Sequence, residues 1–144
     1  MKTKADPRHT SRKVALASIF CWLFNEPNTE ESMLLSKEVL ETDLNDFDPA
    51  LVSSLVEGVK KHSREIDQII GECAPEWPIE KIAKVDLVVL RIAIFEILFG
   101  KKTPTKVAID EAVEMSKEYG NDTSHKFVNG VLGTVVEKYL EKKQ

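Results

Sequence analysis

The central stretch of the chain, residues 85–99, reads VDLVVLRIAIFEILF and decides the fold class. It is apolar apart from Asp86, Arg91 and Glu96, and its many β-branched residues would also suit a buried strand. The stretch is much longer than the usual strand of about 5 to 6 residues, and no other segment offers a partner strand. It therefore predicts a buried central helix that ends at Gly100.

Two flanking segments carry a helix-start signal in which an N-cap residue precedes proline. Thr103 comes before Pro104 and an apolar stripe that reaches Gly120, which is placed to end the helix in the left-handed conformation. Residues 48–73 begin in the same way with Asp48 and then carry apolar residues at helical spacing. The sequence thus predicts one helix ending at Gly120 and one long helix from Asp48 to about residue 73.

Residues 127–140 contain Asn129-Gly130, a dipeptide typical of a two-residue hairpin turn. Apolar residues spaced four apart run through the dipeptide, which favours a helix instead. Glycine inside a helix costs roughly 1 kcal/mol relative to alanine. Gly130 should therefore let a neighbouring helix approach closely, and the Asn129 amide, if it is buried, should bond to backbone of that neighbour. Gly133 adds a second glycine to the same helix.

Arg91 places a guanidinium within the most apolar part of the chain. Buried charges are normally paired, so Arg91 should form an internal ion pair without a role in activity. The sequence offers Glu96, Asp110 and Glu114 as candidate partners.

Length and composition indicate one compact domain in a reducing compartment. The chain has 144 residues, of which 42% are hydrophobic, and a formal charge of −4. Cys21 and Cys73 stand far apart without neighbouring ligands for zinc. An apolar run at residues 14–24 follows a basic segment, but it lacks a cleavage site and is too short to span a bilayer. We expect a soluble cytoplasmic protein with no membrane association.

The charge is unevenly divided along the chain. Residues 1–13 carry a net charge of +4, whereas residues 26–57 carry a net charge of −8. RNA would be attracted to the first segment and repelled by the second, so any nucleic-acid site must be local. The alternative is that both runs are simply solvated surface.

The sequence contains no pattern that forces catalytic or metal-binding groups together. It has no glycine-rich phosphate loop, no HExxH motif and no nucleophile elbow. His9, His62 and His125 lie far apart, and His62 falls on the inner stripe of the long predicted helix, as a hydrogen-bonded core histidine would. We expect no enzyme activity, no cofactor and no metal.

Three segments, residues 85–98, 107–114 and 124–132, resemble the bacterial NusB transcription antitermination family in order and spacing. The resemblance covers nearly the whole chain and is strongest from Trp77 to Leu132. It implies an all-α, NusB-like fold of two packed helical bundles with about seven helices. The single domain would span residues 1–144, with subdomains of roughly 1–75 and 76–144.

The resemblance also implies a function and its partners. Members of the family pair with the ribosomal protein NusE and bind the single-stranded boxA element of ribosomal RNA transcripts, helping RNA polymerase resist termination. They are not catalytic, and the free protein could form a homodimer. The expected RNA-binding residues are Arg8, Arg12, Lys13, Phe20, Thr123, Lys126 and Phe127, and Asp86 is the expected contact for NusE.

Two of these residues, Phe20 and Asp86, could also have a purely structural role. Phe20 could stack on a base, but it lies on an apolar stripe and would equally suit the core. Asp86 could meet a basic residue of NusE, but an acid near a helix start is also favourable in itself.

The alternative function is a protein-interaction scaffold in ribosome assembly without direct RNA readout, and an enzyme is a distant third. Binding of boxA RNA in the presence of NusE would separate the first two, and turnover of a substrate would be needed for the third.

Overall fold

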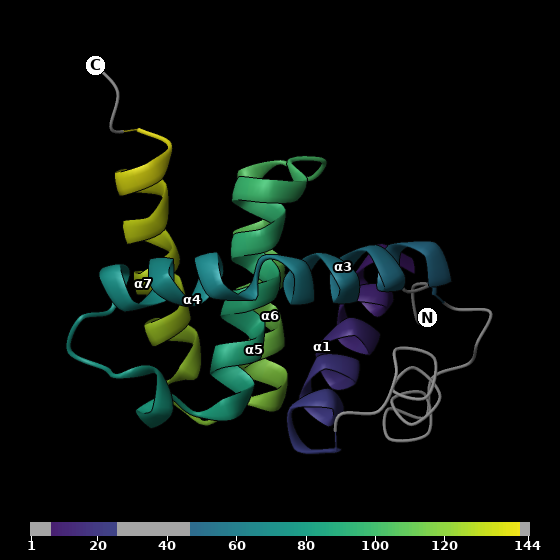
Figure 1. Ribbon diagram of the computed structural model, residues 1–144, viewed down its shortest axis with the longest axis horizontal. Helices are drawn as coiled ribbons and strands as arrows, with labels where there is room; N and C mark the ends of the chain where they lie inside the picture. The colour runs from purple at the N-terminus through teal and green to yellow at the C-terminus, as the bar shows by residue number, and fades with distance from the viewer. Residues whose placement is uncertain (1–6, 26–46, 142–144) are drawn as a thin grey trace, which may run out of the picture. The chain divides into compact units, whose positions relative to one another are not determined.

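The computed structural model describes residues 7–25 and 47–141, and every regular element in these ranges is helical (Figure 1). This confirms the predicted all-α class. The α-helices are α1 (Pro7–Asn25), α3 (Pro49–Lys61), α4 (Ser63–Cys73), α5 (Lys84–Ile94), α6 (Thr105–Tyr119) and α7 (Ser124–Tyr139). A 3-10 turn, η2 (Ile79–Lys81), precedes α5, and a π-helical turn, η3 (Phe95–Gly100), follows it.

Packing divides the chain between Gly58 and Val59 into two compact units. This division falls near the end of α3, so α4 packs with the elements that follow it. The sequence placed its subdomain boundary later, near residue 75. Most of the acidic run at residues 26–57 lies outside the described residues.

The first unit joins the start of α1 to the start of α3 through one buried serine. The Ser11 hydroxyl donates to the carbonyl of Pro7 at 2.6 Å and accepts the backbone N–H of Asp48 at 2.9 Å. Asp48 Oδ1 in turn accepts the N–H of Ala50 at 3.0 Å, which confirms the expected N-cap. Polar side chains, rather than apolar contacts alone, therefore fix where α3 begins.

The predicted single helix over residues 48–73 is interrupted at His62, so that part of the prediction is wrong. The backbone of His62 leaves the helical region at φ −103° and ψ 16°, between α3 and α4. Its ring stacks on Phe99 with centroids 4.3 Å apart, and Nδ1 lies 3.1 Å from Glu65 Oε1. His62 is hydrogen-bonded as expected, but it is half-buried rather than part of the closed core.

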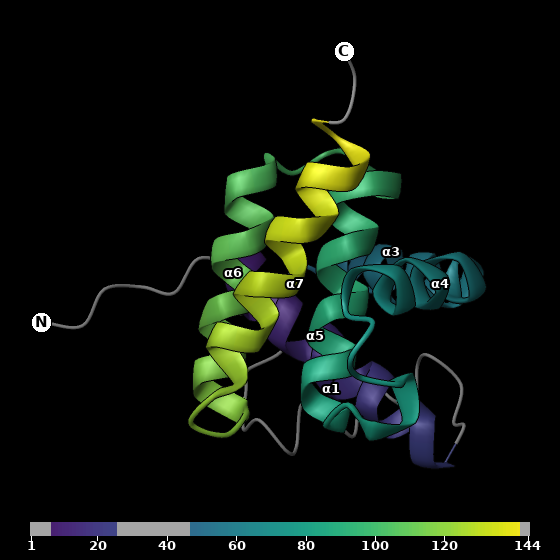
Figure 2. The ribbon, with the colours of Figure 1, turned by 90° about the vertical axis from the view of Figure 1, so that its left-hand side faces the viewer.

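α5 is the central helix of the second unit. It lies beside α6 and α7, while α4 crosses the group (Figures 1 and 2). All nine residues from Asp86 to Ile94 are buried, as a helix that is apolar on every side requires. The predicted end at Gly100 is confirmed, although the last six residues form the π-helical turn η3.

The connection from η3 to α6 differs from the expected capping pattern. Thr103 does not cap α6, because its hydroxyl donates to Glu96 Oε1 at 2.7 Å. Gly120 ends the helix in an extended conformation at φ −95°, not in the left-handed one. The left-handed residue is instead Lys101, with φ 56°, whose N–H bonds to the carbonyl of Glu96 at 3.0 Å.

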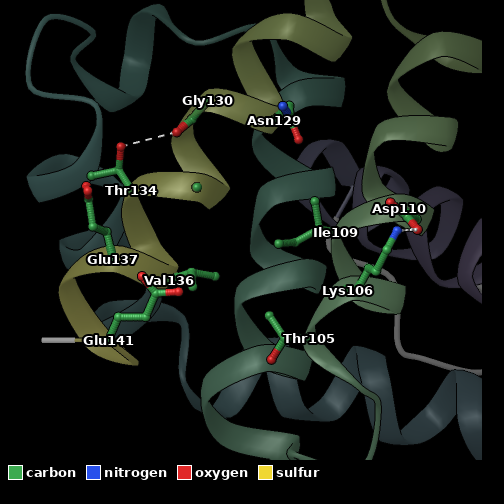
Figure 3. Close-up of a pocket in the computed structure, with 11 residues that line it drawn as sticks. Thr105, Lys106, Ile109, Asp110, Asn129, Gly130, Thr134, Val136, Glu137 and Glu141 are labelled. Carbon is green, nitrogen blue, oxygen red and sulfur yellow. Dashed lines mark hydrogen bonds and ion pairs between the residues drawn. The ribbon is translucent and has the colours of Figure 1, made fainter. Parts of the chain in front are cut away.

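α7 runs through Asn129-Gly130 as a helix, which confirms the rejection of a hairpin. The predicted close approach at Gly130 is wrong, because a Cβ built there meets nothing within 4 Å. Asn129 is exposed, so the condition for its predicted bond to a neighbouring backbone is not met. Both residues line a shallow groove of about 760 Å³ on the α6–α7 face, and Gly133 also has open space where its Cβ would lie (Figure 3).

Arg91 forms the predicted internal ion pair, but its partner in that pair is none of the three acids proposed from the sequence, Glu96, Asp110 and Glu114. Nε and Nη2 donate to the two carboxylate oxygens of Asp67 on α4, each at 2.9 Å. The three proposed acids all follow Arg91 in the sequence, whereas Asp67 precedes it, on α4, which packs against α5.

Candidate nucleic-acid and partner interface

A pocket of about 210 Å³ in the second unit brings together residues from two of the motifs that carried the sequence prediction. Asp86 comes from the first turn of α5, and Thr123 and Phe127 come from the start of α7. The pocket is lined by Trp77, Lys81, Ile82, Ala83, Asp86, Asn121, Thr123 and Phe127. An expected partner contact and two expected RNA contacts therefore share one concave site.

Asp86 lies in this pocket with an unusual electrostatic environment. Its side chain is buried at 6% exposure, and Oδ1 has no hydrogen-bond partner. Burial raises the pKa of Asp86, and a hydrogen bond from Ser124 partly opposes this shift. The carboxylate thus keeps one acceptor without a donor, which is costly unless a ligand supplies one.

A tight turn before α7 holds the other side of the pocket. The backbone N–H and the hydroxyl of Thr123 both donate to Asn121 Oδ1, each at 2.9 Å. The N–H of Asn121 donates to the Ser124 hydroxyl at 3.0 Å, which orients that hydroxyl for Asp86. Lys126 is exposed on the first turn of α7 but does not line the pocket.

Trp77 is a residue of this site that the sequence reasoning did not select. Its side chain is 51% exposed, and its ring meets Phe127 edge to face, with centroids 6.2 Å apart and planes at 75°. A signal was present in the sequence, because Trp77 stands between Glu76 and Pro78, outside the helical stripes. An apolar ring outside any helical stripe has no core role to explain it.

The expected RNA contacts of α1 lie in the first unit and differ in accessibility. Arg8 is exposed, and Lys13 and Phe20 are half-buried. Arg12 is only 4% exposed, and its Nη1 lies 3.4 Å from the carbonyl of Arg8. The guanidinium of Arg12 therefore supports the start of α1 in this structure.

Within residues 7–25 and 47–141, no group of three or more His, Cys, Asp or Glu side chains is arranged to hold a metal ion. None of the helices described there is long and apolar enough to cross a membrane. Cys21 and Cys73 are both free thiols.

The NusB family model matches residues 9–137 of the chain. The transcription antitermination protein NusB of Roseiflexus castenholzii (strain DSM 13941 / HLO8) is 41% identical over 140 residues, covering 96% of this chain and 97% of that protein. Among solved structures, T. maritima NusB matches with a TM-score of 0.77 at 31% identity, covering 96% of this chain and 94% of that one. A crystal structure of antitermination factors NusB and NusE in complex with dsRNA matches with a TM-score of 0.77 at 25% identity, over 92% of this chain and 97% of that one. The chain therefore belongs to the NusB family.

Proposed function

We propose that this chain pairs with ribosomal protein NusE, binds the single-stranded boxA element of ribosomal RNA transcripts, and helps RNA polymerase resist termination. The observation that carries the proposal is the pocket in which Asp86, Thr123 and Phe127 meet. The similarity to the structure of NusB and NusE in complex with dsRNA supports the two classes of partner.

Asp86 is the proposed contact for NusE. Its buried Oδ1 lacks a donor, so a cationic side chain of the partner would complete the hydrogen bonding of the carboxylate. The same contact would offset the desolvation that raises the pKa of Asp86. A simple helix-start role does not need a buried oxygen without a partner, so this geometry favours the partner role.

The RNA would be held by phosphate contacts and by aromatic rings. Arg8, Lys13 and Lys126 are the proposed phosphate contacts, and Phe20 and Phe127 are the proposed stacking rings. Thr123 is a further proposed contact, since it lines the same pocket as Phe127. We assign Arg12 to positioning this end of α1, because its side chain is buried.

The test is a titration of labelled boxA RNA and a scrambled strand with the chain, with and without NusE. We expect tighter binding of the boxA strand, and binding that weakens steeply with salt. Arg8→Glu should lower the affinity for both strands, since an exposed phosphate contact carries no sequence information. Arg8 is a better site for this test than Arg12, where a buried carboxylate would disturb the fold.

Assembly with NusE but no binding of either RNA would contradict the proposal. That result would instead favour the alternative role as a protein scaffold in ribosome assembly. Asp86→Asn should weaken the complex with NusE, and an unchanged affinity would remove Asp86 from the partner interface.

A further inference from the structure

Trp77 is the most exposed large apolar side chain of the part of the chain that the structure describes. It lies in the turn between α4 and η2, with Pro78 directly after it. Leaving half of an indole in water forgoes a substantial gain from burial. An exposed ring on the rim of a pocket is therefore a feature that a ligand would explain.

The contact with Phe127 holds the indole in a defined place. The edge-to-face geometry, with planes at 75°, is the arrangement that aromatic pairs prefer. A ring held by its neighbour before binding loses little conformational freedom when a base stacks on it. Phe127 is itself a proposed RNA contact, so Trp77 extends that surface from α7 onto the turn before α5.

The charge around Trp77 indicates stacking rather than phosphate binding. Glu76, Glu80, Lys81 and Lys84 are all exposed between the turn and the first residue of α5, and their charges sum to zero. Such a segment does not attract a phosphate backbone by itself. A flat aromatic face can nevertheless bind any base, because stacking does not depend on net charge.

We propose that Trp77 is a base-stacking residue that seats one unpaired nucleobase of the bound RNA beside Phe127, at the rim of the Asp86 pocket. This inference rests on the proposed RNA-binding function. It adds a contact that acts through its ring, in contrast to the cationic contacts of α1 and α7.

The experiment uses the full chain with NusE and labelled boxA RNA. Trp77→Leu keeps an apolar side chain but removes the ring, and it should raise the dissociation constant for RNA by about 5- to 100-fold. Trp77→Phe should retain most of the affinity. Tyr139→Leu is the matched control, because Tyr139 is an exposed ring at the far end of α7 and should leave RNA binding unchanged.

Two further readouts distinguish stacking from other roles. The salt dependence of RNA binding should be the same for Trp77→Leu and the parent, whereas Lys126→Ala should reduce the slope by about 0.7. In a Trp22→Phe background, Trp77 is the one remaining tryptophan of the chain, and RNA should quench its selectively excited fluorescence. The nucleotides of the strand would then be replaced one at a time by an abasic unit. Quenching of Trp77 should be lost for the replacement at one position only.

If the parent and Trp77→Leu bind RNA with equal affinity, this inference is overturned while the proposed function remains intact. Weaker binding of NusE by Trp77→Leu, with unchanged RNA affinity, would show that the partner protein covers the ring, and would also overturn it. Absence of RNA binding by the parent itself would remove the proposed function, and this inference with it.

Discussion

Arg91 illustrates how one charge is accommodated in the most apolar helix of the chain. Its side chain is 10% exposed, and the planar guanidinium makes two parallel hydrogen bonds to Asp67, which is 33% exposed. The pair joins α4 to α5. The cost of burying the cation is met by one specific acid on a neighbouring helix.

Asp67→Ala should therefore destabilise the protein by about 2 kcal/mol, less than for a fully buried pair because Asp67 is partly exposed to water. Urea unfolding would measure the loss. Asp110→Ala removes the exposed pair with Lys106 and should change the free energy of unfolding by less than about 0.5 kcal/mol. Equal losses in the two variants would contradict the role assigned to the Asp67–Arg91 pair.

Asp86 links stability to pH through its buried carboxyl group. Because burial raises its pKa, the folded protein binds the proton more tightly than the unfolded chain does. The contribution of Asp86 to stability therefore falls as the pH rises from its ordinary pKa through the raised value. Above that interval the ionised group is a constant cost to the fold.

Asp86→Asn keeps the shape and an acceptor for Ser124 but cannot ionise. We expect the variant to gain stability relative to the parent as the pH is raised from about 4 toward neutrality. Thermal unfolding of both proteins across this pH range would measure the difference. A difference that stays constant or shrinks with rising pH would show that the carboxylate is not destabilised by burial.

At the scale of elements, α7 combines a buried apolar side with an exposed side that contains two glycines. Val128, Val131 and Leu132 are buried, whereas Gly130 and Gly133 are exposed, with open space where a Cβ would lie. Glycine lowers helix stability through the entropy of the unfolded chain. α7 is thus held by its packing against α5 and α6 rather than by the helix propensity of its own sequence.

Gly130→Ala and Gly133→Ala should each stabilise the protein by roughly 0.5 to 1 kcal/mol. Chemical unfolding would measure both changes. Gly120→Ala is the contrasting control, because its Cβ would lie 2.5 Å from the Ser124 hydroxyl and 2.7 Å from the carbonyl of Ser116. Gly120→Ala should therefore lose stability. A loss of stability in Gly130→Ala would contradict the open space found around the Cβ position of Gly130.

At the scale of the whole molecule, the function proposed above needs two ligands to act together. Asp86 is assigned to the partner and Phe127 to the RNA, and both line one pocket. Ligands that meet in one site influence each other through shared side chains. Any such coupling must be reciprocal when it is measured as binding free energy.

NusE should therefore raise the affinity of the chain for boxA RNA, by about tenfold, and RNA should raise the affinity for NusE by the same factor. Calorimetric titrations of each pair and of the three components would measure both factors. Independent binding of the two ligands would contradict the assignment of Asp86 and Phe127 to a shared site.

The helical pattern and the order of its motifs were sufficient for the fold class and the family. Long-range partners were not predictable in the same way. Thr103 was expected to cap α6 but bonds to Glu96, and the break at His62 accompanies a stacking contact with Phe99. The sequence marked Trp77 only as a ring outside the helical stripes, and its contact with Phe127 on another element could not be predicted.

The sequence was sufficient to predict that residues 85–99 form a helix, since periodic apolar residues and the absence of partner strands leave a helix as the way to bury them. Which side chains meet is evident only in the folded protein: Asp67 pairs with Arg91, Arg12 is buried, and Oδ1 of Asp86 is left without a donor in a pocket that Trp77 also lines. The reason is physical. Periodicity is a local property of the chain, whereas burial and pairing depend on how helices pack in three dimensions.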